Sequence, residues 1–396
     1  MRLNTPKNFI SNAIAALCLS VLLVSPGQAA NNGIAEVEKI VVQAIQPVMQ
    51  RYGIPGMAVG IVADGHNYVY DFGVMSKATG KPVTSDTLFE IGSVSKAFTA
   101  TLVSYAQAVG HLSLSDNASQ YLPALRGSSF DHVSLLNLGT HTSGGLPLQV
   151  PDDIKDDGQL MRYFRDWKPA YAPGTFRTYG NPGIGMLGMI AAASLNDSFD
   201  ALMERQVFRP LGLRHTYLHV PPAELTHYAQ GYTKMDVPVR MTPGVLASEA
   251  YGIRTTVGDM LRFIEANLNP ASTDAELQGA ITATHTGYYR LGSMTQDLIW
   301  EQYRYPVDLQ DLLTGNSSKV SYEANPVVRI DPPSPPQDDV LINKTGSTNG
   351  FGAYVAFIPG NKIGIVLLAN KNYPIDARVT AAYEILTRLI EKASGN

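Results

Sequence analysis

Short apolar runs with turn signals between them crowd the two ends of the chain, and they constrain the fold more than any other feature of the sequence. Near the N-terminus, Met57–Val62 and Asn67–Phe72 are apolar or alternating, and Asp64-Gly65 between them is typical of a β-hairpin. Three runs of the same kind near the C-terminus are Leu341–Thr345, Gly350–Ile358 and Ile363–Ala369. We therefore expect strands from both chain ends to share one antiparallel sheet.

Helical patterns flank these strands and fill the middle of the chain. Residues Ile34–Arg51 and Asp376–Lys392 form amphipathic patterns, so we expect both terminal helices to pack on the sheet. The proline-rich stretch Pro332–Pro336 predicts a surface loop. The predicted fold class is α/β of the α+β kind: an antiparallel sheet from both chain ends, flanked by helices, plus a mostly helical second domain.

The first thirty residues have the pattern of a secretory signal peptide. Arg2 and Lys7 form a basic start, residues 13–24 are almost wholly apolar, and small residues follow at 27–30. The apolar run is shorter than the roughly 20 residues that a membrane-spanning helix needs. The sequence therefore predicts a signal peptide over residues 1–29, export to a bacterial periplasm, and no membrane anchor after cleavage.

The remaining chain is expected to form one domain without disulfides, because the only cysteine, Cys18, lies in the leader. An α/β part would cover about residues 30–108 and 320–396, and a helix-rich part about 109–319. The composition, with 45% hydrophobic and 16% charged residues, is that of an ordinary globular enzyme. The formal charge is −4 for the full chain and becomes −6 once Arg2 and Lys7 of the leader are removed, a mild negative balance that argues against nucleic acid or an anionic membrane as a partner.

The first chemical motif is Ser93-Val94-Ser95-Lys96 at the start of a predicted helix. A spacing of three residues places Lys96 on the same helix face as Ser93, one turn further on. A helix N-terminus also offers free backbone amides to a developing negative charge. This is what an activated serine needs, although the same four residues alone are as consistent with a helix cap beside a solvated lysine.

Two further motifs, which follow in a fixed order, favour the activated serine over the helix cap. Tyr179-Gly180-Asn181 comes 86 residues after Ser93, and Lys344-Thr345-Gly346 comes 165 residues after Tyr179. A phenol beside a lysine can relay a proton, an amide can orient a substrate, and a cationic strand can hold a carboxylate. The set of three resembles the motifs of the serine β-lactamases and penicillin-binding proteins.

Longer segments make the resemblance specific to class C β-lactamases, and it runs from about residue 34 to the C-terminus. The segments that carry it are Leu88–Lys96, Gly144–Gln149, Pro173–Thr175, Glu249–Gly252, Lys344–Tyr354 and Ala369–Pro374. The fold that this resemblance implies is the β-lactamase/transpeptidase-like fold.

The resemblance also implies roles for individual residues. Ser93 would be the acylated nucleophile, and Lys96 and Tyr179 would share proton transfer. The backbone amides of Ser93 and Ser347 would form the oxyanion hole. The implied catalytic set is Ser93, Lys96, Tyr179 and Lys344, and the implied substrate-binding set is Gln149, Asn181, Thr345, Gly346, Ser347, Asn372 and Arg378.

Two positions depart from the pattern of the family, and several alternative motifs need weighing. Gly180 stands where Ala or Ser is usual, and Ile375 where many members have Asn; both affect the expected substrate profile.

Ser115-Asp116-Asn117 spells a class A motif, but we interpret Asp116 as a helix cap. We interpret the glycines of Gly183–Gly188 as close helix packing, not as a dinucleotide site, and His215 and His219 as surface residues.

The predicted function is hydrolysis of cephalosporins and penicillins through an acyl-enzyme on Ser93, which would confer resistance to β-lactams. No metal or other cofactor is expected, the partner is the small-molecule substrate, and a monomer is the expectation for the family. The alternative on the same scaffold is a D-Ala-D-Ala carboxypeptidase or an esterase. A non-catalytic β-lactam sensor is the alternative of another class.

Overall fold

The computed structural model describes residues 26–63, 65–269 and 274–394. The chain divides into two units, residues 1–39 and 40–396, and in the first unit the described residues form the start of helix α1 (Pro26–Tyr52). Most of the predicted signal peptide, including Cys18, lies outside the described residues. Among the described helices, none combines the length and the apolar character that would let it cross a membrane.

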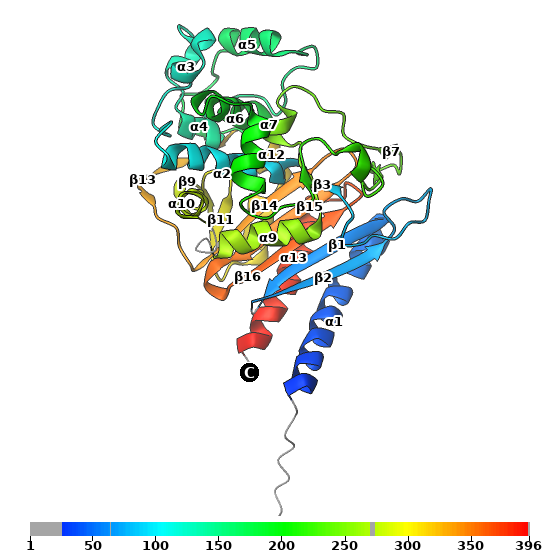
Figure 1. Ribbon diagram of the computed structural model, residues 1–396. Coiled ribbons are helices and arrows are strands. Elements are labelled where there is room, and N and C mark those ends of the chain that lie inside the picture. The colour runs from blue at the N-terminus through cyan, green and yellow to red at the C-terminus, as the bar shows by residue number, and fades with distance from the viewer. Residues whose placement is uncertain (1–25, 64, 270–273, 395–396) are drawn as a thin grey trace, which may run out of the picture. The chain divides into compact units, whose positions relative to one another are not determined.

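A nine-stranded antiparallel sheet dominates the second unit, and it joins the two ends of the chain as predicted (Figure 1). The pairing of β1 with β16 places Met57 opposite Ala369 and Val62 opposite Gly364. The order across the sheet is β13 (Val328–Ser334), β9 (Gly287–Leu291), β10 (Met294–Gln296), β11 (Glu301–Arg304), β14 (Val340–Ser347), β15 (Gly352–Ile358), β16 (Ile363–Ala369), β1 (Gly56–Ala63) and β2 (His66–Gly73).

Two features of this sheet differ from the sequence analysis. Strands β9, β10 and β11 come from the part of the chain that we expected to be helical, and their short alternating runs did not stand out against it. The predicted surface loop at Pro332–Pro336 is wrong in its first half, since β13 extends to Ser334. Prolines fit there because β13 is an edge strand, where the backbone amide that proline lacks has no partner strand to bond.

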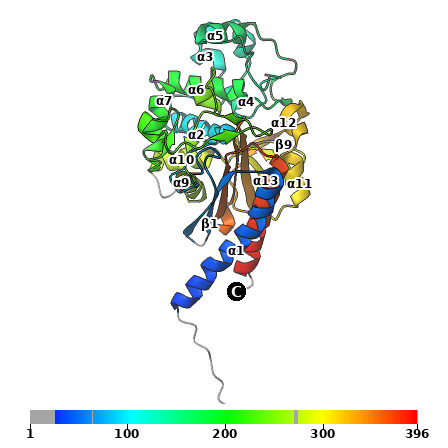
Figure 2. The same ribbon diagram turned by 90° about the vertical axis from the view of Figure 1, so that its right-hand side faces the viewer.

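Helices cover both faces of the sheet (Figure 2). Helix α9 (Val257–Leu268) packs on β1 and β16 from one side, and α13 (Ile375–Ser394) packs on β15 and β16 from the other. Further helices, with the short ones included, are α2 (Ser95–Ala108), α3 (Ala118–Tyr121), α4 (Leu135–Gly139), α5 (Asp157–Asp166), α6 (Asn181–Ser194), α7 (Phe199–Leu202), α8 (Ala247–Ala250), α10 (Ala275–Ala283), α11 (Leu309–Gly315) and α12 (Ser318–Tyr322).

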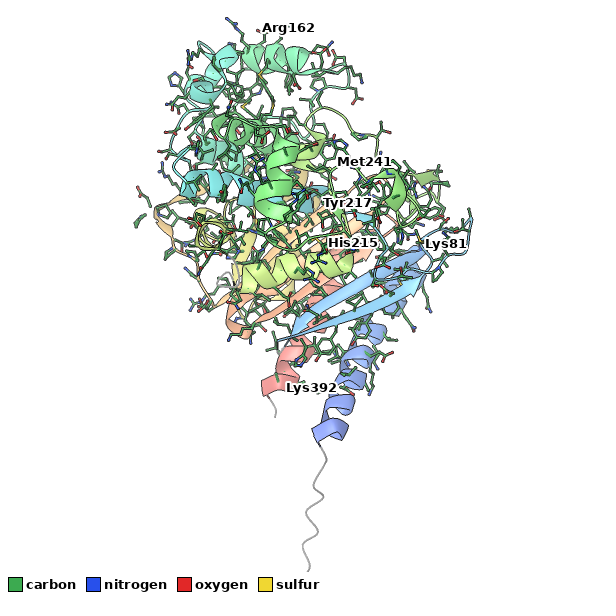
Figure 3. The ribbon with its side chains drawn as sticks, in the orientation of Figure 1. Lys81, Arg162, His215, Tyr217, Met241 and Lys392 are labelled. Atoms are coloured by element: carbon green, nitrogen blue, oxygen red, sulfur yellow. The ribbon has the colours of Figure 1, made fainter. Side chains whose placement is uncertain are left out.

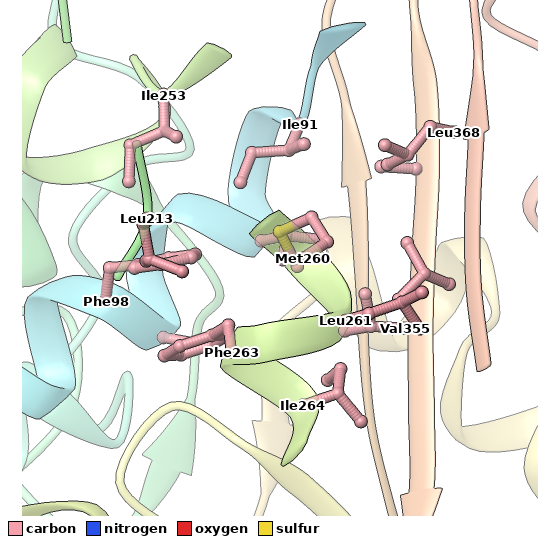
Figure 4. Close-up of a cluster of buried hydrophobic side chains, with 14 of the residues drawn as sticks. Ile91, Phe98, Leu213, Ile253, Met260, Leu261, Phe263, Ile264, Val355 and Leu368 are labelled. Atoms are coloured by element: carbon pink, nitrogen blue, oxygen red, sulfur yellow. The ribbon is translucent and has the colours of Figure 1, made fainter. Parts of the chain in front are cut away.

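The main hydrophobic core lies between α2, α9 and the sheet (Figure 4). Every residue of β1 is buried, because this strand lies between β16 and β2 and is covered on both faces, whereas β2 at the edge alternates between exposed and half-buried positions. The rings of Phe98 and Phe263 stack at 3.8 Å between centroids, and Ile264 and Val355 pack in the same cluster. This core fixes α2 on the sheet, and with it the residues at the start of α2.

A second hydrophobic cluster holds the helical part together around α6. The glycines of Gly183–Gly188 permit close packing as predicted: a Cβ at Gly185 would lie 2.8 Å from Leu246, and one at Gly188 would lie 2.8 Å from Glu249. Helix α8 therefore lies directly against α6, and α6 begins at Asn181, a residue of the predicted site.

Candidate active site

Ser93 lies where the sheet meets the helical part. It belongs to a 3-10 turn, Gly92–Val94, which follows strand β3 (Phe89–Glu90) and runs into α2. This turn abuts the end of β14: a Cβ on Gly92, whose φ is +50°, would lie 2.6 Å from the backbone nitrogen of Ser347. A Cβ on Gly346 would lie 1.9 Å from the carbonyl oxygen of Ile91. The two glycines thus let the backbone at Ser93 and Ser347 come together.

Lys96 lies one turn into α2 and is fully buried. Its ammonium group donates to the Ser93 hydroxyl at 2.9 Å, to Oδ1 of Asn181 at 2.5 Å and to the carbonyl oxygen of Ala250 at 2.9 Å. Burial lowers the pKa of Lys96 to about 8, and the positive charge of Lys344 also lowers it, while Tyr179 acts in the opposite direction. A lysine with this pKa can accept and return a proton near neutral pH.

Tyr179 faces the same hydroxyl from a loop between the helical part and the sheet. Burial raises the pKa of the phenol, but the positive charges of Lys344 and Lys96 and a hydrogen bond with Ser93 outweigh it and bring the pKa to about 8. The Nζ atoms of Lys344 and Lys96 lie 5.0 and 5.5 Å from the centre of the ring. His141 packs against the ring at 4.5 Å between centroids. Lys96 and Tyr179 thus both have a lowered pKa and both contact the Ser93 hydroxyl, an arrangement that is chemically able to move a proton to and from that oxygen.

Sequence analysis missed a buried ion pair behind Tyr179. Arg177 donates to Glu301 at 2.7 Å and to Gln296 at 2.6 Å, and the side chains of Arg177 and Glu301 are 1% and 6% exposed. Glu301 also lies 3.9 Å from Nζ of Lys344. Arg177 stands two residues before Tyr179, at strand spacing, but Glu301 comes from β11, which was not predicted. The carboxylate offsets part of the positive charge gathered around Tyr179.

His141 is a second residue that sequence analysis missed. It is buried with its ring on Tyr179, its φ is 60°, and its Nε2 has no hydrogen-bond partner among the described residues. Burial lowers the pKa of its imidazole well below the ordinary value, and the nearby cations Arg177, Lys96 and Lys344 add to the effect. The ring therefore adds no further positive charge to the site.

Gln149 and Asn181 form a pair of amides on one side of Ser93. Asn181 donates from Nδ2 to Oε1 of Gln149 at 2.8 Å, and its backbone amide donates to the carbonyl oxygen of Leu148 at 2.9 Å. Pro147, Leu148 and Gln149 are exposed on a loop that lies against Gly180. The departure at Gly180 thus coincides with a close approach of two backbone segments.

Most of the predicted site residues line one cavity of about 930 Å³. Strand β14 forms one wall, and its pairing with β15 holds Lys344 opposite Val355 and Ser347 opposite Gly352. Met241, in the segment after β7 (Pro238–Val239), also lines the cavity. Its side chain is labelled in Figure 3. The predicted site residues that line the cavity are Ser93, Gln149, Tyr179, Asn181, Lys344, Thr345, Gly346, Ser347 and Asn372.

Arg378 and Lys96 lie behind this surface. Arg378 is fully buried on α13, and its guanidinium donates to Ser347 Oγ at 2.9 Å, to Asn372 Oδ1 at 2.9 Å and to the Gly346 carbonyl oxygen at 2.6 Å. It therefore meets the cavity through Asn372 and Ser347. Ile375 lines the cavity and adds an apolar surface near Asn372.

Glu90, three residues before Ser93, fastens another wall of the cavity. Its Oε1 accepts hydrogen bonds from the Tyr228 hydroxyl at 2.5 Å and from the backbone amide of Met241 at 2.8 Å. Arg240 lies over the same Tyr228 ring at 4.3 Å. The strand that leads to the nucleophile thus also holds the segment that follows β7.

The alternative motifs have structural roles. Asp116 is not a helix cap, since Asn117 precedes α3; its Oδ2 instead accepts from the Tyr121 hydroxyl at 2.6 Å and from the backbone amide of Ser113 at 2.8 Å. His219 is exposed, as predicted, and its Nε2 lies 2.9 Å from Oδ2 of Asp200. Among the residues that the structure describes, no group of three or more His, Cys, Asp or Glu residues could hold a metal ion.

Comparisons with known proteins agree with this geometry. Residues 41–389 match the β-lactamase family. A β-lactamase from Pseudomonas fluorescens is 51% identical over 354 residues, which cover 89% of this chain and 99% of that protein. A class C β-lactamase solved in complex with cefoxitin is 53% identical, with a TM-score of 0.87 over 90% of this chain and 99% of that one.

A second solved structure is similar to the same extent and has a different name. It is a D-alanine carboxypeptidase from Burkholderia cenocepacia, 56% identical, with a TM-score of 0.86 over 89% of this chain and 99% of that one. The described architecture, the matched residues and these likenesses lead to one conclusion: the chain belongs to the β-lactamase family, among its class C serine enzymes.

Proposed function

We propose that the protein hydrolyses the lactam amide of cephalosporins and penicillins through an acyl-enzyme on Ser93. The observation that carries this proposal is the 2.9 Å hydrogen bond between the Ser93 hydroxyl and Nζ of Lys96, in a cavity that Tyr179 also lines. A serine beside a proton-accepting pair at the start of a helix is an activated nucleophile. The similar enzyme that was solved with cefoxitin supports a β-lactam as the ligand.

In the acylation step, the Ser93 oxygen attacks the lactam carbonyl carbon, and its proton passes to the pair formed by Lys96 and Tyr179. The backbone amides of Ser93 and Ser347 stabilise the oxyanion, as the close approach at Gly92 and Gly346 allows. The carbon–nitrogen bond then breaks, and the nitrogen takes a proton from the pair.

Deacylation uses the same pair, Lys96 and Tyr179, for a second round of proton transfer. Water attacks the ester carbonyl carbon beside Tyr179, its proton passes to the same pair, and Ser93 leaves with a proton restored to its oxygen.

Gln149 and Asn181 meet the amide of the acylamino side chain, while Lys344 and Thr345 hold the substrate carboxylate. Asn372 completes that end of the cavity, and Arg378 orients it. No step requires a metal or another cofactor.

The second candidate is a D-alanyl-D-alanine carboxypeptidase, which the likeness to the Burkholderia cenocepacia protein favours. Both activities begin with acylation of Ser93, so the rate of deacylation separates them. A chromogenic cephalosporin and a D-Ala-D-Ala peptide should be assayed in parallel with the purified enzyme. Rapid, multiple turnover of the cephalosporin supports the proposal, whereas a long-lived penicillin adduct together with peptide cleavage would favour the carboxypeptidase.

The cellular setting follows from the leader and is part of the same proposal. Residues 1–29 would direct export to the periplasm and be removed, leaving a single two-part domain that works as a monomer. An enzyme in that compartment meets β-lactams before they reach their targets, and its activity would confer resistance. A periplasmic extract that contains the processed chain and hydrolyses the cephalosporin would support this setting.

A further inference from the structure

Gly180 is held against another backbone segment with no room for a side chain. Its φ of −169° and ψ of 166° describe extended backbone, which any residue adopts, so its conformation does not require glycine. Space does: a Cβ at this position would lie 2.2 Å from the carbonyl oxygen of Pro147 and 3.4 Å from Cα of Leu148. A larger residue therefore needs the segment 147–149 to move away by about 1 Å, the distance that restores an ordinary contact.

This close approach is coupled to the pair of amides beside Ser93. The backbone amide of Asn181, the next residue, donates to the Leu148 carbonyl oxygen at 2.9 Å. The Asn181 side chain is then held from two sides, since Oδ1 accepts from Lys96 at 2.5 Å and Nδ2 donates to Gln149 at 2.8 Å. Gln149 is exposed in the cavity and has no burial of its own to fix it.

We propose that Gly180 is a specificity-determining positioning residue, which sets the place of Gln149 relative to Asn181 and thereby the recognition of the acylamino side chain of the substrate. This inference rests on the proposed function, in which these two amides meet that side chain. Gly180 itself touches no substrate. It acts by letting the segment 147–149 lie against the start of α6.

The consequence is a selective effect. Ser93 lies in the 3-10 turn that runs into α2, and Lys96 lies on α2 itself, which packs in the core; neither belongs to the segment 147–149. Moving that segment shifts Gln149 and leaves the nucleophile where it is. The kcat/KM for substrates that bind the amide pair should fall, and the kcat/KM for substrates without an acylamino group should stay the same.

The experiment compares Gly180→Ala with the wild-type enzyme on two substrates. One is a cephalosporin with an acylamino side chain, and the other is its counterpart with a free amino group on the ring. We expect kcat/KM for the first to fall about tenfold relative to the second, as for the loss of one well-placed hydrogen bond. The ratio of the two constants does not depend on the folded fraction, so loss of stability alone cannot produce this result.

Two further variants make the test decisive. Gly279→Ala on α10, where a Cβ would meet nothing within 4 Å, is the matched control and should leave the ratio unchanged. Gln149→Ala should reproduce the selective loss, and adding Gly180→Ala to it should change the ratio no further. The proposal is overturned if Gly180→Ala lowers both constants equally or leaves both unchanged, or if Gln149→Ala leaves the ratio intact. Failure of the proposed function would show itself differently, as wild-type enzyme that turns over neither substrate.

Discussion

Helix α2 takes part both in the hydrophobic core that it forms with α9 and in the candidate active site at its start. The core buries apolar side chains, whereas the site buries charged ones. Around Phe98, the core packs apolar side chains against the sheet, and such burial stabilises the fold roughly in proportion to the area removed from water. In the site, Lys96, Arg177 and Lys344 are each at most 1% exposed, and the carboxylate of Glu301 lies among them. Buried charges cost free energy unless they are paired and hydrogen-bonded.

The contrast teaches that neighbouring residues of one helix have different roles. The apolar side chains of α2 pack in the core and hold the helix in place. Its first turn carries Lys96, whose positively charged form is disfavoured by burial. Lowered pKa values at Lys96 and Tyr179 are the result of that arrangement. Substitutions in the polar region should therefore change activity or pH dependence as well as stability, whereas those in the core should change stability alone.

The strongest way to break this contrast is to remove one partner of the buried ion pair. In Arg177→Met, Glu301 loses its nearest counter-charge and keeps the more distant Lys344, so we expect the free energy of unfolding to fall by about 3–5 kcal/mol. Denaturant unfolding measures this. The double variant with Glu301→Leu should recover part of the loss, and a double variant no more stable than the single one would contradict the pairing.

A smaller effect is expected from Glu249, which lies near the site on α8. Burial raises the pKa of its carboxyl to about 7, above the value of an unfolded chain near 4.5. The neutral form is thus favoured in the folded state, and the stability that it contributes is complete below pH 4.5 and is lost as pH rises through 7. Glu249→Gln should match wild type at pH 4 and be about 2–3 kcal/mol more stable at pH 8, as followed by unfolding at both values. An equal difference at the two pH values would show that the carboxyl does not titrate in this way.

The smallest effect sharpens the comparison from the apolar side. Ile264 on α9 packs in the core, and its Cγ2 would lie 2.5 Å from a Cβ at Gly364 on β16. Ile264→Val removes one methylene and should lower the free energy of unfolding by about 1 kcal/mol while kcat/KM stays at the wild-type value. A change in kcat/KM below the melting temperature would mean that the core and the site are not separable.

Sequence reasoning named most of the residues that the structure brings together around the cavity, because they lie in short local motifs. Ser93 and Lys96 share a helical turn, Tyr179 and Asn181 flank one glycine, and Lys344 to Ser347 lie on one strand. The same reasoning found the hairpin and the C-terminal strands, whose apolar runs are long.

What it missed depends on distant parts of the chain. Glu301 comes from the short strand β11, whose position is fixed by pairing with β14 and not by a strong local pattern. His141 has no motif partner, because its contact with Tyr179 arises only from folding. The burial of Arg378, with its donors turned toward Ser347 and Asn372, could not be predicted from spacing either.

The most direct test of the central claim is the activity of Ser93→Ala, measured with a chromogenic cephalosporin and accompanied by mass spectrometry during turnover. We expect the wild-type enzyme to show a transient mass increase equal to the substrate. In the variant this adduct should be absent, and kcat should fall by roughly 10⁴-fold or more, with unfolding that differs from wild type by less than about 1 kcal/mol. Hydrolysis by Ser93→Ala at a rate near that of wild type would contradict the assignment of Ser93 as the nucleophile.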